Sequence, residues 1–241
     1  MDTSLIILGI ALIIILYIVF FYMTAKDSLA DRLDLAQIQT PNLATSLTKP
    51  ESAKYSYEMW LYVYGTKENA ITTGESYIFY RYDNDADGNP NKNKNIGLKL
   101  TSTKPSLTLE YTKTVDSTTK SPVSMQITDN LPLQTWVHLI ISVDNSYIDI
   151  YMNGKLVKSV KDSIATPSLS KSVIYESSKT YLAKFERTAA PIDPQTAWNH
   201  YLSGNGENPI KKYTGDYNLA LSFKKGEKDS DAWNLNILGG Q

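Results

Sequence analysis

The chain has 241 residues with a formal net charge of −1, and 42% of the residues are hydrophobic. This composition excludes a disordered or fibrous protein, and the balanced charge gives no broad attraction for nucleic acid, so no nucleic-acid partner is expected. Because the sequence has no cysteine and 2 histidines, disulfide scaffolds, thiolate catalysis and cysteine-based zinc sites are also excluded, and little remains for a histidine metal site.

The first predicted element is a transmembrane anchor over residues 1–26, because residues 3–25 carry no charged side chain. An apolar run longer than about 18 residues can cross a bilayer as a helix. A cleaved signal peptide is disfavoured, because its apolar region is shorter and its start is basic, whereas Asp2 is acidic. The bilayer is therefore an expected partner through residues 4–25, which include Leu5, Ile10, Ile15, Phe20 and Tyr22.

The charges that flank this run predict its orientation. Lys26 and Arg32 follow the run, and no basic side chain precedes it. The positive-inside rule then places the C-terminal bulk on the cytosolic side of a single-pass membrane protein. The lack of cysteine suits a reducing compartment. The lack of any N-x-Ser/Thr sequon agrees with the same orientation.

Residues 27–54 are predicted to be a juxtamembrane linker. Leu29, Leu33 and Ala36 recur at positions i, i+4 and i+7, which favours a short helix. Thr40-Pro41 would end it, since a residue before proline avoids the α region. The remainder of the linker is expected to be an extended tether.

Residues 55–241 are predicted to form an all-β domain. Short runs rich in Tyr, Val, Ile and Thr, several of them with period-2 alternation, lie between turn clusters. This pattern favours a sandwich or barrel. The expected strands are Tyr55–Tyr64, Ser76–Tyr82, Ile96–Leu100, Ser106–Thr112, Val123–Ile127, Thr135–Val143, Tyr147–Met152, Lys155–Val160, Ser172–Glu176, Thr180–Phe185, Tyr217–Lys224 and Ala232–Leu238.

Two local signals inside this domain are specific. Asn153-Gly154 between two strand patterns predicts a two-residue hairpin, because both residue types tolerate positive φ. Pro194–Leu202 is predicted to be a short helix, with Asp193 as its cap, proline in its first turn and Gly204 as its stop.

The stretch from Thr135 to Val160 contains the pattern W-x-H, D and Y-x-N-G-K, and an earlier strand carries Trp60. This pattern resembles the signature of laminin-G-like domains. The resemblance implies a concanavalin-A-like jelly roll of two antiparallel sheets, a fold that serves many functions. The matching positions are Trp136, His138, Asp144, Tyr151, Asn153, Gly154 and Lys155.

A second pattern, W-x-x-Y-L-x-G-x-G, follows at Trp198, Tyr201, Leu202, Gly204 and Gly206. Together with the anchor and the laminin-G-like domain, it resembles membrane-anchored laminin-G-like proteins of large DNA viruses. The resemblance implies a minor capsid or structural protein of the virion, which links an internal membrane to the capsid shell. Its partners would be capsid or other shell proteins, with the C-terminal domain on the cytosolic, capsid-facing side.

Two alternatives remain on the same fold. A membrane-anchored lectin-like module would bind glycans. A glycosidase would need two carboxylates facing one sugar, but Glu58, Glu110, Asp149 and Glu176 are isolated in the sequence and are interpreted as solvated strand positions. No enzymatic activity is therefore expected, and His138 is interpreted as a packing or hydrogen-bonding residue.

One candidate metal site occurs, at Asp83, Asp85 and Asp87, in the pattern D-x-D-x-D-G. Alternate carboxylates can converge on Ca²⁺, but position 12 of the loop is Lys94 in place of the bidentate glutamate of an EF-hand. A polar turn explains the pattern better. Calcium is thus the one cofactor considered, and none is otherwise expected.

Overall fold

A computed structural model of the chain describes residues 8–17, 26–37, 39–42, 44–65, 75–83, 93–101, 105–114, 120–166, 173–176, 178–206, 220–223 and 233–236. The chain divides into two compact units, residues 1–205 and 206–241. The second unit contains an antiparallel pair, β12 (Ala220–Phe223) with β13 (Trp233–Asn236). The domain predicted over residues 55–241 includes residues of both units.

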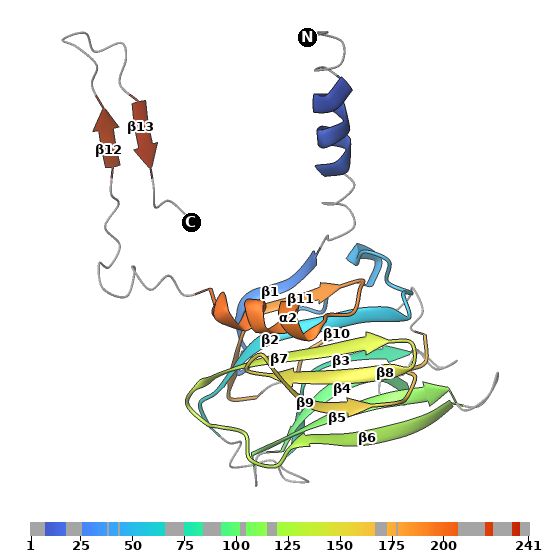
Figure 1. The fold of residues 1–241 in the computed structure, drawn as a ribbon. Helices are drawn as coiled ribbons and strands as arrows, with labels where there is room; N and C mark the ends of the chain where they lie inside the picture. The colour runs from blue at the N-terminus through green and yellow to red at the C-terminus, as the bar shows by residue number, and fades with distance from the viewer. Residues whose placement is uncertain are drawn as a thin grey trace. The chain divides into compact units, whose positions relative to one another are not determined.

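The first unit contains two antiparallel sheets (Figure 1), which confirms the all-β jelly-roll prediction. The six-stranded sheet has the order β1 (Lys26–Asp34), β11 (Thr180–Thr188), β2 (Lys54–Val63), β7 (Trp136–Asp144), β8 (Tyr147–Met152) and β9 (Lys155–Val160). The five-stranded sheet has the order β10 (Val173–Ile174), β3 (Glu75–Asp83), β4 (Asn93–Thr101), β5 (Ser106–Thr114) and β6 (Lys120–Thr128). A short 3-10 turn, Ala44–Ser46, and the helix α2, Pro194–Leu202, complete the described elements of this unit after residue 26.

The inward faces of both sheets form one apolar core. Alternating residues such as Leu107, Leu109 and Tyr111 on β5 point into it. At its centre the Tyr57, Phe79 and Phe185 rings pack with centroids 4.9–5.9 Å apart. Aromatic side chains bury large apolar areas, so this cluster contributes strongly to the free energy of folding.

The central strands β2 and β7 are buried on both faces. Seven successive residues of β7, 137–143, are buried, and so are residues 55–61 of β2. The second buried face is covered by α2, which lies along the six-stranded sheet (Figure 1). Outward residues of these strands, which alternation alone would place in solvent, are therefore enclosed.

The predicted juxtamembrane helix is wrong. Residues 26–34 form strand β1, which pairs antiparallel with β11 from Lys26↔Thr188 to Asp34↔Tyr181. Leu29 and Leu33 are an even number of residues apart, so they share a face in a strand as well as in a helix. The edge of β11 is available for pairing, and this pairing favours a strand over a helix for residues 26–34. The local pattern could not reveal it.

The predicted tether is also part of the sandwich. The buried Arg187 on β11 donates to the backbone oxygens of Thr48 and Lys49 at 2.7 and 3.1 Å. The Asp27 carboxylate, 3.4 Å from the same guanidinium, accepts from the Thr48 amide at 2.9 Å. These bonds satisfy a buried cation and hold Asp27, Thr48 and Lys49 against β11.

Residues 8–17 form a helix whose large apolar side chains, including Ile10 and Ile15, are exposed. Leu5, Phe20 and Tyr22 of the predicted anchor lie outside the described residues. Within the described part of the chain, no helix combines the length and apolarity required for a transmembrane span.

Candidate functional site

Helix α2 forms where local signals predicted it. The Asp193 carboxylate accepts from the amides of Gln195 and Thr196 at 2.9 and 3.0 Å, and proline occupies the first turn. Gly204, just beyond the helix, has φ 72°, a conformation that glycine adopts without strain. The helix is thus closed at both ends by its own sequence.

The hairpin turn between β8 and β9 is the surface on which α2 packs. Asn153 and Gly154 have φ of 49° and 74°, as a type I′ turn requires, which confirms the predicted hairpin. A Cβ on Gly154 would lie 2.8 Å from Trp198 Cε3 and 3.0 Å from Tyr201 Cβ. Glycine is therefore needed here for close approach of the helix as well as for the turn.

A buried polar cluster joins α2 to β2 and β7. Glu58 Oε1 lies 3.0 Å from His138 Nε2, and Glu58 Oε2 lies 2.7 Å from His200 Nδ1. Because an ionised carboxylate only accepts, both imidazoles donate to it. Lys26 Nζ lies 3.7 Å from Glu58 Oε2 and 3.0 Å from Glu186 Oε2.

The surroundings of Glu58 control its ionisation. Burial raises the pKa of this carboxyl, but hydrogen bonds from His138 and His200, with the charges of His200 and Lys26, lower it by more. Its pKa is consequently well below the usual value of 4.5. Glu58 is therefore an anion at neutral pH, enclosed with only 7% of its surface exposed.

Aromatic rings surround this cluster. Trp60 lies 4.9 Å from the His138 ring and stacks on Tyr201 at 5.8 Å, with an interplanar angle of 18°. Trp198 lies 5.6 Å from Tyr201 on the same helix. The helix is thus held by stacked rings as well as by the shared carboxylate.

Other contacts hold the ends of α2. Lys184 lies at a β-bulge of β11 with φ 45°, and its ammonium donates to the Gly204 oxygen at 2.7 Å. A bulge re-aims a side chain, and a cation at a helix C-terminus is favourable. Before the helix, Ser142 Oγ accepts from the Ile192 amide at 2.9 Å.

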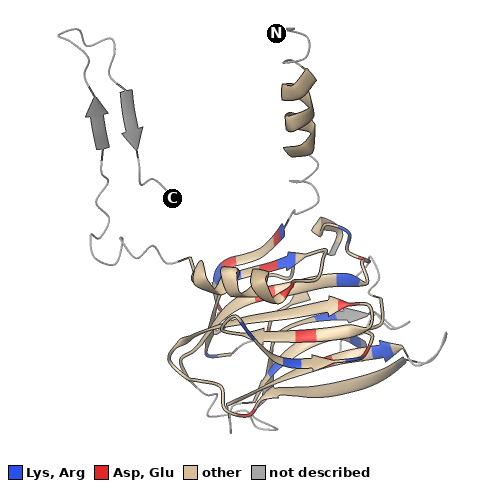
Figure 2. Cartoon of the chain, in the orientation of Figure 1, with Lys and Arg blue, Asp and Glu red and all other residues tan. Residues whose placement is uncertain are grey.

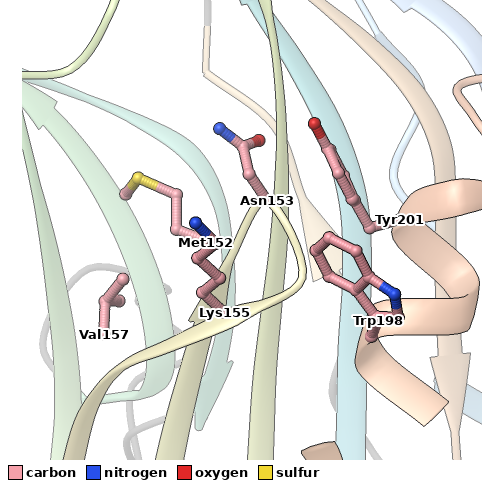
Figure 3. A pocket seen from close by; sticks show the side chains of 6 residues that line it. All are labelled: Met152, Asn153, Lys155, Val157, Trp198 and Tyr201. Atoms are coloured by element: carbon pink, nitrogen blue, oxygen red, sulfur yellow. The ribbon is translucent and has the colours of Figure 1, made fainter. Parts of the chain in front are cut away.

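A groove of about 400 Å³ lies between α2 and the β8–β9 hairpin (Figure 3). Trp198 and Tyr201 form one side, and Lys155 and Val157 lie on the hairpin side. The Trp198 side chain is partly open, with 38% of the residue exposed. The groove is lined by Met152, Asn153, Lys155, Val157, Trp198 and Tyr201.

The signature residues have mainly structural contacts. The Asn153 side-chain oxygen accepts from the His138 amide at 3.0 Å, and Tyr151 packs below Ile192. Trp136 packs 5.4 Å from Tyr62, and Asp144 forms an ion pair with Lys54 at 2.7 Å. His138 is a buried hydrogen-bonding residue, consistent with the prediction.

The isolated acids are not all solvated. The interpretation of Glu58 as a solvated strand residue is wrong, since it binds two histidines. Glu110 binds Lys99 at 2.7 Å and the Tyr77 hydroxyl, and Glu176 accepts from the Tyr77 amide at 2.9 Å. Each of these three carboxylates is engaged by protein groups.

The calcium hypothesis stays a prediction. Asp85 and Asp87 lie outside the described residues, as does the side chain of Asp83 at the end of β3. Within the described residues, no group of three or more His, Cys, Asp or Glu side chains could hold a metal ion.

Sequence reasoning missed the cluster because its members are remote. Glu58 is 80 residues from His138 and 142 from His200. The available signal in the sequence was that both histidines of the chain lie within the two family-like patterns. His138 is in W-x-H, and His200 is in W-x-x-Y-L-x-G-x-G.

This two-sheet architecture with its W-x-H and N-G elements places the chain in a defined class. A family model described as the concanavalin A-like lectin/glucanases superfamily, Laminin_G_3, matches residues 36–206. The chain belongs to this family. The comparison with curated proteins finds no match.

Solved structures that are similar to this chain include binding domains of botulinum neurotoxins. The receptor-binding domain of botulinum neurotoxin D is 12% identical, with a TM-score of 0.50, and the match covers 73% of this chain and 44% of that one. The type G receptor-binding domain is 14% identical, with a TM-score of 0.45 and coverages of 76% and 47%. The chain thus spans less than half the length of these structures, and the likeness concerns the fold.

Proposed function

We propose that this protein is a non-enzymatic, membrane-anchored structural protein that links an internal virion membrane to the capsid shell. Its N-terminal segment would lie in the bilayer, and its sandwich, on the cytosolic side, would bind shell proteins. The family and the two-sheet fold support a binding module, and the tail pattern supports the virion role.

The observation that carries the proposal is the N-terminal helix. Its large side chains from Leu8 to Tyr17 are all apolar or aromatic and all exposed. Figure 2 shows no charged residue along it. A helix that is apolar all round requires apolar surroundings. The uncharged run of residues 3–25, which contains this helix, has enough residues to cross a bilayer.

Strand β1 adds a geometric consequence. The uncharged run ends at Ala25, and β1 begins at Lys26. The predicted span thus reaches the first residue of the sandwich in the sequence, and under this proposal the sandwich would be held close to the membrane surface. A shell protein bound to it would lie within about one domain diameter of the bilayer, roughly 3–4 nm for a compact domain of this size.

The anchor is tested by membrane extraction of the full chain from its source cells. Ile10→Lys with Ile15→Lys should release the protein into the carbonate-soluble fraction, because each lysine near a bilayer centre costs about 3 kcal/mol. Ser124→Lys with Ser159→Lys, both at exposed strand positions, is the matched control and should stay in the membrane. Release of the wild-type chain would overturn the anchor.

The shell role is tested by chemical cross-linking in purified particles. Reproducible links from residues 26–205 to an abundant coat protein are expected. Absence of the chain from particles would overturn this role.

A carbohydrate-binding module is the second candidate. The partly exposed indole of Trp198 at the groove favours it, since sugars stack on aromatic faces. Binding of the full chain in detergent to an immobilised glycan, lost in Trp198→Ala, would support this function over the shell role.

A further inference from the structure

We infer that the groove between α2 and the β8–β9 hairpin is the docking site for a segment of a partner protein that carries a carboxylate beside an apolar side chain. This inference rests on the proposed function and names the face through which the sandwich binds. The observations are the apolar walls, the charge and the rigidity of the groove.

The surface around the groove is apolar and open. Val157 and Trp198 are 47% and 38% exposed. Two further apolar residues of the same elements, Leu156 in β9 and Leu202 in α2, are 50% and 64% exposed. Tryptophan, tyrosine and methionine, which line the groove, are enriched at protein interfaces. Exposed apolar side chains concentrated in two adjacent elements indicate an interaction site.

Two polar side chains of the groove, Lys155 and Asn153, offer hydrogen-bond donors. Lys155 is the one charged residue among those that line it, and its ammonium has no ion pair in the described part of the chain. The Asn153 side-chain oxygen is occupied by the His138 amide, which leaves the amide nitrogen as a donor. Because α2 contributes no acidic side chain, a carboxylate is the complementary ligand.

The walls are held in place before any partner binds. Trp198 packs against Gly154, and Tyr201 stacks on Trp60. His200, between them in α2, is fixed to Glu58 at 2.7 Å. A pre-organised surface loses little conformational entropy on binding.

The edge strand itself is protected against strand addition. Lys155 and Lys158 lie on β9, and Lys161 follows it. Lysines on an edge disfavour pairing with another strand. A sugar would need several hydrogen-bonding partners. The groove offers two donors, Lys155 and Asn153, flanked by aliphatic side chains. These observations favour the side chains of a protein segment as the ligand.

The test is selection of a random 12-residue peptide library on phage against the full chain in detergent micelles. Enriched peptides should carry Asp or Glu within a few residues of an aromatic or aliphatic residue. A synthetic peptide of that sequence should bind Lys155→Glu at least about fivefold more weakly, since the ion pair becomes a repulsion. Lys161→Glu, an exposed lysine that does not line the groove, is the matched control and should bind as the wild type does.

A charge exchange sharpens the test. The peptide with its acid changed to lysine should regain binding to Lys155→Glu. Trp198→Ala should lose binding of the original peptide while its circular dichroism spectrum remains that of the folded chain. The inference would be overturned by enrichment of peptides without acids, by equal binding of the peptide to Lys155→Glu, or by no enrichment over empty micelles. It would also be overturned if a soluble glycan displaced the peptide at a concentration below that of the peptide. If the groove inference fails, cross-links in particles between a coat protein and another face of the sandwich would still support the shell role. Absence of the chain from particles would overturn the shell role itself.

Discussion

The two faces of strands β2 and β7 contrast within the same few residues. The inner face, with Met59, Leu139 and Ile141, is mainly apolar and packs against the second sheet. The outer face carries Glu58 and His138 beneath α2. Both faces are buried. The inner face is buried by apolar packing, and the outer face by a few hydrogen bonds and stacked aromatic rings.

The contrast separates two ways of specifying structure. Apolar packing is non-directional, so any apolar strand face of suitable shape can join the inner core. The outer face permits one arrangement, since an unpaired carboxylate or imidazole would be costly to bury. The first arrangement provides most of the stability, and the second determines where the helix lies.

The inner face should show the largest loss of stability. Phe185→Ala removes a buried ring that contacts Tyr57 and Phe79 and should lower the free energy of unfolding by about 3–5 kcal/mol. Urea unfolding of the full chain in detergent, followed by tryptophan fluorescence, measures it. Leu133→Ala, at an exposed position, should change the value by less than about 0.5 kcal/mol. Similar losses for both variants would contradict the assigned core.

The carboxylate of the outer face should matter next. Glu58→Gln removes a charged acceptor of two hydrogen bonds and should reduce stability by about 2–3 kcal/mol at pH 7. Because the pKa of folded Glu58 is lowered, its contribution is present above the usual value of 4.5 and is lost as the pH falls below it toward the folded pKa. The difference between wild type and Glu58→Gln should therefore shrink in acid. A difference that grows below pH 4.5 would reverse the assigned sign.

The turn beneath α2 should have a smaller effect. Gly154→Ala places a Cβ 2.8 Å from Trp198 Cε3 at φ 74° and should reduce stability by about 1–2 kcal/mol. Hydrogen exchange of α2 amides should quicken more than that of β5 amides. Gly9→Ala, where nothing lies within 4 Å, is the control and should leave both unchanged.

The helix cap should have the smallest effect. Asp193→Ala removes the acceptor of two backbone bonds at the start of α2 and should reduce stability by about 1 kcal/mol. Asp193→Asn keeps an acceptor and should retain most of the stability. Equal losses in both variants would show that the charge, and not the hydrogen bonds, is what acts at this position.

Local patterns were sufficient wherever the decisive interaction was local. The Asn153-Gly154 turn and the Asp193 cap each depend on φ preferences or bonds within three residues, so short stretches of sequence predicted them. Alternation likewise predicted the strands that face the core. The spacing of Leu29 and Leu33 suits a helix and a strand equally, and there the local signal was misleading.

The amino-acid sequence by itself determined the laminin-G-like all-β fold, the short helix and the long uncharged run at the N-terminus. Only the tertiary structure decided that residues 26–34 are a strand, that Glu58 lies between two histidines, and that Lys155 lies opposite Trp198 across a groove. These contacts join residues between 43 and 162 positions apart. Pairing over such distances depends on how the sheets close, which no local pattern records.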